Sequence, residues 1–264
     1  MKRAALVLCI SAGALTACRG SRAGDTFVWH DAVRAGQRVT IHNLNGPVRV
    51  RAASGPDVEI RAAKHYKGWR PERVRFVVTT TDEGAVVCAL WGSGGECSES
   101  DYRAGKSVWP RILSLRSDVQ VEFTVAVPSG VLVNAQTTNG GVTVEGVGAP
   151  VKAGTVNGSI RVATSAGPVT ASTVNGSIVA RVDSFAAVGP MTLTTVNGSV
   201  TAELPGALDA TVDMQTVNGR VDSDFPLTVT GAVSSKRLRG TVGGGGREIK
   251  LETVNGRVAV RRGA

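Results

Sequence analysis

The sequence predicts an all-β protein, a right-handed β-solenoid of short strands joined by Asn-Gly turns. Three observations lead to this prediction. The tetrapeptide T-V-N-G occurs five times in the second half of the chain, and a looser copy, T-T-N-G, precedes them. Short runs of β-branched residues that alternate apolar and polar side chains surround each copy, as expected of half-buried strands. No segment shows a sustained period of 3.6 residues, so helix is expected to be nearly absent.

The Asn-Gly pairs recur at a nearly fixed interval. They are Asn139-Gly140, Asn157-Gly158, Asn175-Gly176, Asn197-Gly198, Asn218-Gly219 and Asn255-Gly256. Their glycines are separated by 18, 18, 22, 21 and 37 residues. Self-similarity with a period near 20 residues is typical of solenoids. Because one such unit is too thin to bury its apolar face alone, it must stack on its neighbours.

One unit illustrates the expected local structure. Residues 158–163 form a short strand, residues 164–168 a turn, and residues 169–173 a second strand. Alternation predicts a shared inward face. Its members are Ile160, Val162, Val169, Ala171 and Thr173.

The residue types of the turn have backbone reasons. Gly tolerates positive φ without steric cost, and Asn is the next most tolerant residue, with a side chain that bonds nearby backbone groups. Asn amides stacked at successive levels can also donate and accept hydrogen bonds along a ladder. The motif is therefore interpreted as a structural turn and not as a multiplied active site.

A second architecture uses the same signal. Asn-Gly between two short strands is also typical of a type I′ hairpin, which would build an antiparallel β-sandwich of Asn-Gly hairpins. The recurring Thr and Val favour the solenoid, because equal residues lie over each other in a parallel stack whereas hairpins need only a compatible turn. Proximity of Asn157 to Asn175 would distinguish stacked coils from hairpins.

The chain divides into four expected regions by composition. Residues 1–17 are a lipoprotein signal peptide and residues 18–26 a tether. Residues 27–135 contain all four Trp and are expected to form an aromatic-containing β region, a first coil plus a cap. Residues 136–262 are the Asn-Gly repeat solenoid.

Three segments interrupt the repeat and are the expected carriers of function. Insertions lengthen the repeat at Asp183–Pro190 and Leu227–Ile249, and solenoid insertions commonly lie on one face and bind partners. The third segment is the polar loop between Cys88 and Trp109. Solenoid ends must also avoid edge pairing, which we expect Arg261 and Arg262 to prevent at one end.

The first residues predict export and lipid anchoring. Lys2 and Arg3 precede a short apolar run that is well below the roughly 20 residues of a membrane-spanning helix. The run ends in L-T-A-C, which resembles a lipobox, so Cys18 is the expected acylation site. No Asp follows Cys18, which in a host with two membranes favours the outer membrane over the inner one. We therefore expect an exported, membrane-anchored lipoprotein.

Cysteine and charge limit the chemistry further. Cys88 and Cys97 are expected to form a disulfide, because export places them in an oxidising compartment. Their spacing is not that of metal ligands and the chain has three His, so no metal or cofactor is expected. The net charge of +9 favours an anionic polymer as partner, and an envelope protein is the other expected partner. The basic cluster Ser235–Arg239 lacks interleaved aromatic residues, which argues against nucleic-acid binding.

No catalytic constellation emerges from the sequence. The strongest hint is Asp222-Ser223-Asp224, which places two carboxylates on one face of a strand. The leading hypothesis is a non-enzymatic cell-envelope lipoprotein with an adhesive, binding or structural role. A carbohydrate-active β-helix enzyme and an envelope signalling partner of a membrane regulator are the two alternatives.

Several stretches resemble a known family. The signal with Cys18, the T-V-N-G-[SR]-[IV] units and the closing R-G-T-V-G-G-G-G-R-E-I-K-L-E-T-V-N-G-R-V-A-V are similar to the bacterial "putative-adhesin" family of β-strand-repeat envelope proteins. The likeness covers roughly residues 38 to 262. It implies an all-β stack at the cell surface with an adhesive role, and it implies no catalytic residues.

Overall fold

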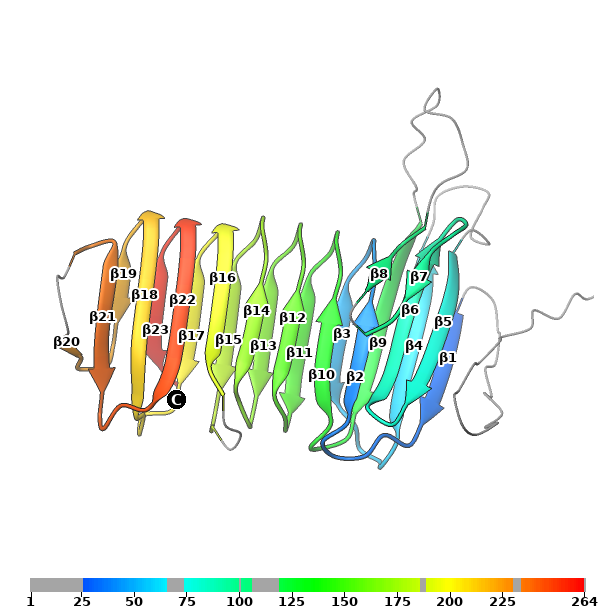
Figure 1. Ribbon diagram of the computed structural model, residues 1–264, viewed down its shortest axis with the longest axis horizontal. Helices are drawn as coiled ribbons and strands as arrows, with labels where there is room; N and C mark the ends of the chain where they lie inside the picture. The colour runs from blue at the N-terminus through cyan, green and yellow to red at the C-terminus, as the bar shows by residue number, and fades with distance from the viewer. Residues whose placement is uncertain are drawn as a thin grey trace, which may run out of the picture.

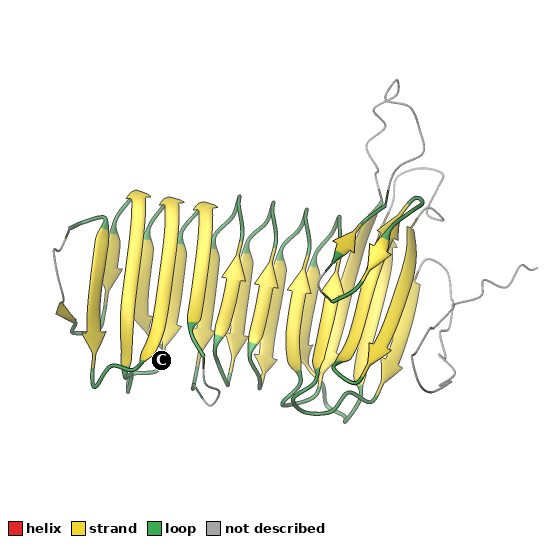
Figure 2. Ribbon diagram, viewed as in Figure 1, coloured by secondary structure: helices red, strands yellow, loops and turns green. Residues whose placement is uncertain are grey.

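A computed structural model describes residues 26–65, 74–99, 101–105, 119–185, 189–229 and 234–263. The predicted signal peptide and Cys18 lie outside these residues. The described residues form strands and turns without a helix (Figure 2). The all-β prediction is therefore confirmed.

Two large sheets run along the molecule and face each other (Figure 1). Sheet A consists, in spatial order, of β1 (Thr26–Asp31), β4 (Val58–His65), β9 (Gln120–Val127), β3 (Val48–Ala52), β11 (Val142–Val147), β13 (Ile160–Thr164), β15 (Ile178–Val182), β17 (Val200–Leu204), β23 (Val258–Arg262) and β19 (Val221–Ser223). Sheet B consists of β20 (Thr228–Val229), β21 (Arg237–Val242), β18 (Ala210–Asn218), β22 (Arg247–Asn255), β16 (Met191–Asn197), β14 (Val169–Ser172), β12 (Val151–Gly154), β10 (Leu132–Gln136), β2 (Arg38–His42), β6 (Gly84–Trp91) and β5 (Val74–Thr81). A separate hairpin consists of β7 (Glu96–Cys97) and β8 (Tyr102–Arg103).

Each coil of the solenoid is one strand of sheet B, an Asn-Gly corner and one strand of sheet A. Neighbouring coils pair in parallel, for example β13 with β15 and β12 with β14. Asn157 and Asn175 are parallel bridge partners, as stacked coils require. The solenoid prediction is therefore confirmed, and the sandwich of Asn-Gly hairpins is wrong for this chain.

The hydrophobic core lies between the two sheets. The inward face predicted from alternation, Ile160, Val162, Val169, Ala171 and Thr173, is buried. One continuous apolar cluster extends from Trp29 to Val260, so successive coils share a single core. Because the inward residues are mostly Val, Ile, Leu and Ala, the two sheets interlock through small branched side chains.

Thr and Asn tie each corner to the coil beside it. The Thr173 hydroxyl donates a 2.9 Å hydrogen bond to the Gly158 carbonyl of the neighbouring coil. The Asn175 amide donates a 2.9 Å bond to the Asn157 side-chain oxygen. Equivalent Asn bonds form a ladder in the order Asn139, Asn157, Asn175, Asn197, Asn255 and Asn218. The Val of each motif points outward, and its exposed fraction is 38–50% in all five T-V-N-G copies.

The glycines are required chiefly because neighbouring coils approach each other closely. A Cβ atom at Gly176 would lie 2.0 Å from the Gly158 carbonyl oxygen. Among the repeat corners, Gly140, Gly198 and Gly256 have a positive φ of 151–158°, whereas Gly158, Gly176 and Gly219 do not, and no described Asn has one. The expectation of a positive φ is therefore wrong for Asn and confirmed for only three of the six glycines. Close backbone contact between coils is the reason for Gly that all six corners share.

Stacking order departs from chain order at both ends of the solenoid. The last coil in sequence, β22–β23, lies between the coils β16–β17 and β18–β19. At the other end, β2 lies between β6 and β10, and β3 lies between β9 and β11. The first and last Asn-Gly coils of the chain therefore each have a neighbour on both sides.

This order corrects two expectations. The segment Leu227–Ile249 is not a lateral excursion, because it contains β20, β21 and the start of β22, and β21 pairs antiparallel with β18. Arg261 and Arg262 do not end the stack, because β23 is flanked by β17 and β19. The outermost strands are antiparallel or very short, as is common at protected sheet edges.

The replacement Gly176→Ala tests the close approach of coils. Its Cβ would meet a backbone carbonyl that cannot move without shifting the next coil, so we expect a loss of about 2 kcal/mol or more in the free energy of unfolding. Gly206→Ala is the matched control, since nothing lies within 4 Å of its Cβ. Urea denaturation measures both. Equal midpoints for the two variants would contradict the steric explanation.

Candidate binding site

Two rows of polar side chains cross the outer face of sheet B. In-register pairing aligns one row in the order Thr40, Asn134, Lys152, Thr170 and Thr192. The second row is His42, Gln136, Gly154, Ser172 and Thr194. These positions alternate with the buried Val, Ala, Ile and Leu of the core, so strand periodicity fixes their outward direction. Apart from Lys152 and His42, the two rows contain hydroxyl, amide and glycine residues.

A disulfide lobe, defined as residues 92–99 and 101–105, covers one end of these rows. Cys88 on the outer face of β6 forms a disulfide with Cys97 of the lobe. Under the lobe, Val86 and Leu90 form a second apolar cluster with Cys88. The Tyr102 hydroxyl donates a 2.7 Å bond to the Ala89 carbonyl. The lobe is therefore fastened to β6 covalently, by packing and by hydrogen bonding.

A groove of about 580 Å³ lies beside the lobe on the outer face of sheet B. Arg38 of β2 and Glu99 of the lobe line one side, while Asn134, Lys152 and Thr170 continue the first polar row. Its volume falls within the range of about 300–1,000 Å³ that is common for ligand sites. The groove thus lies where Glu99 of the lobe meets strand residues of sheet B and the turn residues Glu83, Pro150 and Pro168.

The charges of the groove are arranged around Glu99. Arg38 donates a hydrogen bond to the Glu99 carboxylate and forms an ion pair with it. That hydrogen bond is the main cause that holds the pKa of Glu99 below its ordinary value, and the charge of Lys152 contributes further. Lys152 itself is exposed and forms no ion pair with any described residue. The groove therefore holds an ionised Glu99 carboxylate paired with Arg38, with the charge of Lys152 and the carboxyl group of Glu83 nearby.

His42 lies buried beside the groove and beneath the lobe. Its ring stacks on Tyr102 with a centroid distance of 5.0 Å and an interplanar angle of 6°. Burial lowers the pKa of His42 from 6.5, the backbone groups of Glu99 and Ser98 oppose this shift, and the charge of Lys152 adds a smaller lowering. His42 Nε2 and Thr40 Oγ1 have no hydrogen-bond partner within the described part of the chain. The lobe thus covers the first members of both polar rows.

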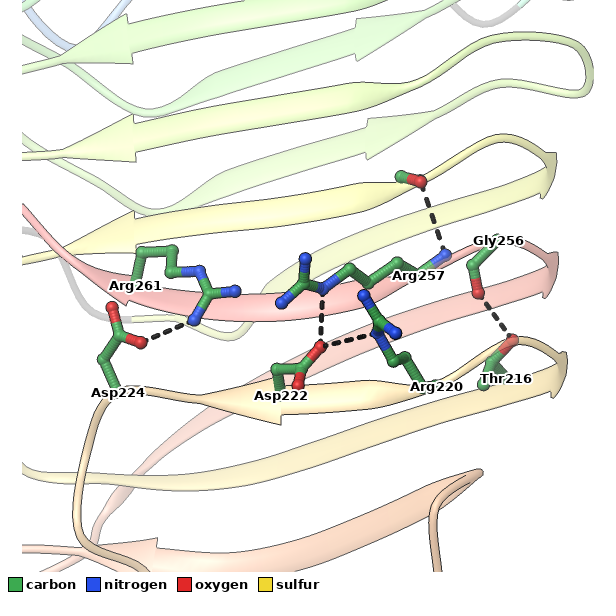
Figure 3. A network of polar contacts seen from close by, with 8 residues as sticks. Thr216, Arg220, Asp222, Asp224, Gly256, Arg257 and Arg261 are labelled. Atoms are coloured by element: carbon green, nitrogen blue, oxygen red, sulfur yellow. Dashed lines mark hydrogen bonds and ion pairs between the residues drawn. The ribbon is translucent and has the colours of Figure 1, made fainter.

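The carboxylates that were the strongest enzymatic hint lie on the other sheet (Figure 3). Asp222 contacts Arg257 at 2.5 Å and Arg220 at 3.6 Å. Asp224 contacts Arg261 at 2.5 Å, which lowers the pKa of Asp224. The pairs with Arg257 and Arg261 join the β19 coil to the inserted β23 coil, so the two carboxylates have a structural explanation.

The other predicted site residues are dispersed. Cys18 and Trp109 lie outside the described residues. The Asn-Gly pairs occupy the corners, away from the groove. In the segment Asp183–Pro190, residues 186–188 are not described, and Phe185 packs against Arg247 with a cation–ring distance of 4.5 Å. The described residues include no group of three or more side chains able to hold a metal ion. No described helix is long and apolar enough to cross a membrane.

The groove residues Arg38, Asn134 and Lys152 were missed by sequence reasoning. Period-two alternation does identify each as an outward-facing strand residue. Their proximity depends on pairing of β2 with β10, which are separated by about 90 residues of intervening chain. No local signal in the sequence specifies that pairing, although the loop that supplies Glu99 was predicted as a functional segment.

Stability should depend on pH through His42. Its pKa is lowered in the folded protein, so between that value and about 6.5 the unfolded chain binds more protons. The free energy of unfolding is therefore expected to fall as pH drops below about 6.5, and His42→Gln should reduce this slope. Urea titrations between pH 7.5 and 5 measure it, with the exposed His30→Gln as control. An unchanged slope in His42→Gln would contradict the prediction.

Comparison with known proteins places the chain in a family. A family model described as Toastrack DUF4097 matches residues 113–261. A search of curated proteins found no match. One similar solved structure is a "putative cell adhesion protein" from Clostridium sporogenes ATCC 15579, with 9% identity, a TM-score of 0.46, and coverage of 89% of this chain and 99% of that one. Another is a "putative adhesin" from Bacteroides fragilis NCTC 9343, with 9% identity, a TM-score of 0.30, and coverage of 91% and 98%. Because the family match spans more than half of the 264 residues, the chain belongs to the Toastrack DUF4097 family.

Proposed function

We propose that this protein is a non-enzymatic cell-envelope protein that binds an extended polysaccharide along the outer face of sheet B. The observation that carries the proposal is the pair of polar rows beside the groove, which present neutral hydroxyl and amide groups on three of the four successive coils from β10 to β16, with Lys152 and Gly154 on the remaining one. A parallel stack repeats such groups about every 4.8 Å, which suits a ligand that is itself a repeating chain.

The chemistry of the rows supports a sugar polymer. Hydroxyl and amide side chains both donate and accept hydrogen bonds, as sugar hydroxyls do. Thr170 and Ser172 are exposed, so binding would not require rearrangement of the core. The prolines Pro150 and Pro168 line the groove and offer apolar contact for the faces of sugar rings.

Anchoring through Cys18 would place this face in the envelope. The motivation is the basic and apolar leader that ends in L-T-A-C. Metabolic labelling with palmitate should mark the wild-type protein and not Cys18→Ala. Equal labelling of both proteins would remove the lipoprotein part of the proposal.

A carbohydrate-active enzyme is the second candidate, favoured by one observation. Glu83 and Glu99 line the same groove, and glycosidases set two carboxyl groups close together. One of the pair must act as a proton donor, which requires a raised pKa. The pKa of Glu99 is instead lowered by Arg38. Glu99 is therefore suited to the ionised partner, and the proton donor would have to be Glu83. We favour binding over hydrolysis because the polar rows extend over several coils beyond this pair, and release of reducing ends from a bound polysaccharide would reverse that preference.

Co-sedimentation with insoluble bacterial cell-wall polysaccharide tests the proposed face. Thr170→Tyr places a bulky ring in the groove and should weaken binding by about fivefold, or roughly 1 kcal/mol. Thr201→Tyr makes the same change on the outer face of sheet A and should leave binding within about twofold of wild type. Equal effects of the two variants, or no sedimentation of the wild-type protein, would contradict the proposal.

A further inference from the structure

We propose that the groove contains a carboxylate-binding site for an acidic polysaccharide, and that Glu99 of the disulfide lobe occupies this site in the free protein. The proposal rests on the function proposed above and specifies the chemical class of its ligand. In this account the lobe supplies an internal substitute for the ligand's carboxylate, which the polymer displaces when it binds.

The Arg38–Glu99 contact has the form of a bound ligand group. Arg38 is the first residue of β2, an interior strand of sheet B, whereas Glu99 belongs to the lobe, 61 residues away in the chain. A guanidinium recognises carboxylates by paired, directional hydrogen bonds, so Arg38 would bind a ligand carboxylate in the same way. The site's preference for a carboxylate, and not for a larger anion, is inferred from the group that already occupies it.

Lys152 of β12 supplies the second cation of the site. It lies in the same polar row as Asn134 and Thr170, and all three line the groove. Lys152 forms no ion pair with another described residue, while its charge reaches both Glu99 and His42. A cation with neutral hydroxyl and amide neighbours is suited to an acidic sugar, whose carboxylate lies among hydroxyl groups.

The charge balance of the groove supports displacement. With Glu99 in place, Arg38 and Lys152 are matched by two carboxylates, Glu83 and Glu99. Removal of Glu99 leaves two cations and one carboxylate, so an incoming carboxylate restores neutrality. A neutral polymer would leave the groove with an unmatched positive charge.

Displacement of Glu99 would cost little. The side chains of Arg38 and Glu99 are 45% and 32% exposed, and exposed ion pairs contribute little net stability. The lobe would stay attached, because the Cys88–Cys97 disulfide and the 2.6 Å bond from Trp91 N to the Ala104 carbonyl do not involve Glu99. A side-chain movement is therefore sufficient to open the site.

Binding of the full-length protein to polygalacturonate tests the proposal. Glu99→Gln keeps the size of the side chain and removes its charge, so affinity should rise by about threefold. Lys152→Ala should lower affinity by about fivefold, and binding should weaken with added salt. Dextran, a neutral polymer, should not respond to Glu99→Gln.

Two controls separate this site from a general effect of net charge. Glu145→Gln and Arg161→Ala make equivalent charge changes on the outer face of sheet A, and both should leave the affinity for polygalacturonate within about twofold of wild type. Equal effects of Glu99→Gln and Glu145→Gln would overturn the proposal. So would an unchanged affinity in Lys152→Ala, or tighter wild-type binding to inorganic polyphosphate than to polygalacturonate.

The outcomes also distinguish this inference from the function on which it rests. If Thr170→Tyr weakens binding to cell-wall polysaccharide while Glu99→Gln and Lys152→Ala have no effect on polygalacturonate binding, the binding face stands and the carboxylate site is wrong. If wild-type protein binds neither material, both proposals fail.

Discussion

The close approach of neighbouring coils at the Asn-Gly corners is the constraint on which the rest of the structure depends. At each corner a glycine lies against the backbone carbonyl of the next coil, at a distance that excludes a Cβ atom. The Thr hydroxyl and the Asn amide then bond across the same gap. These contacts align the parallel strands in register, which places the core residues in rows and the polar residues in outward rows. The candidate groove is a consequence of that alignment, because its residues come from different coils.

Matching corners also explain how the stack can depart from chain order. All the repeated corners present nearly the same surface, so a coil can be accommodated wherever its two neighbours leave one level open. The last coil, β22–β23, occupies such a level, with β23 between β17 and β19. At this level the residue that follows the Asn-Gly pair changes from Ser to Arg. Arg257 and Arg220 contact Asp222 there, whereas Ser199 occupies the equivalent position in β17's coil. Antiparallel β21 then covers the outer edge of β18.

Local signals in the sequence were sufficient to predict the structure of one coil, but not the order in which the coils stack. The identity of the T-V-N-G copies predicted parallel stacking, and alternation predicted the buried face of Ile160 and Val169. Chain order suggested that the sixth Asn-Gly pair follows the fifth in space, which the ladder from Asn197 through Asn255 to Asn218 contradicts. The groove could not be predicted from the sequence for the same reason, since pairing of β2 with β10 is a long-range contact. Only the loop that carries Glu99 had a local signal, its two cysteines.

The stacking order is tested most directly by cysteine cross-linking of the exposed corner valines. Equivalent residues on adjacent parallel strands lie about 4.8 Å apart, so two cysteines there can form a disulfide. Cysteines on coils two levels apart are too distant to form one. The account predicts that oxidation joins Val196→Cys to Val254→Cys, and Val254→Cys to Val217→Cys, as identified by mass spectrometry of the digested protein. Formation of a bond between Val196→Cys and Val217→Cys, without the other two, would show that the coils follow chain order and would contradict the account.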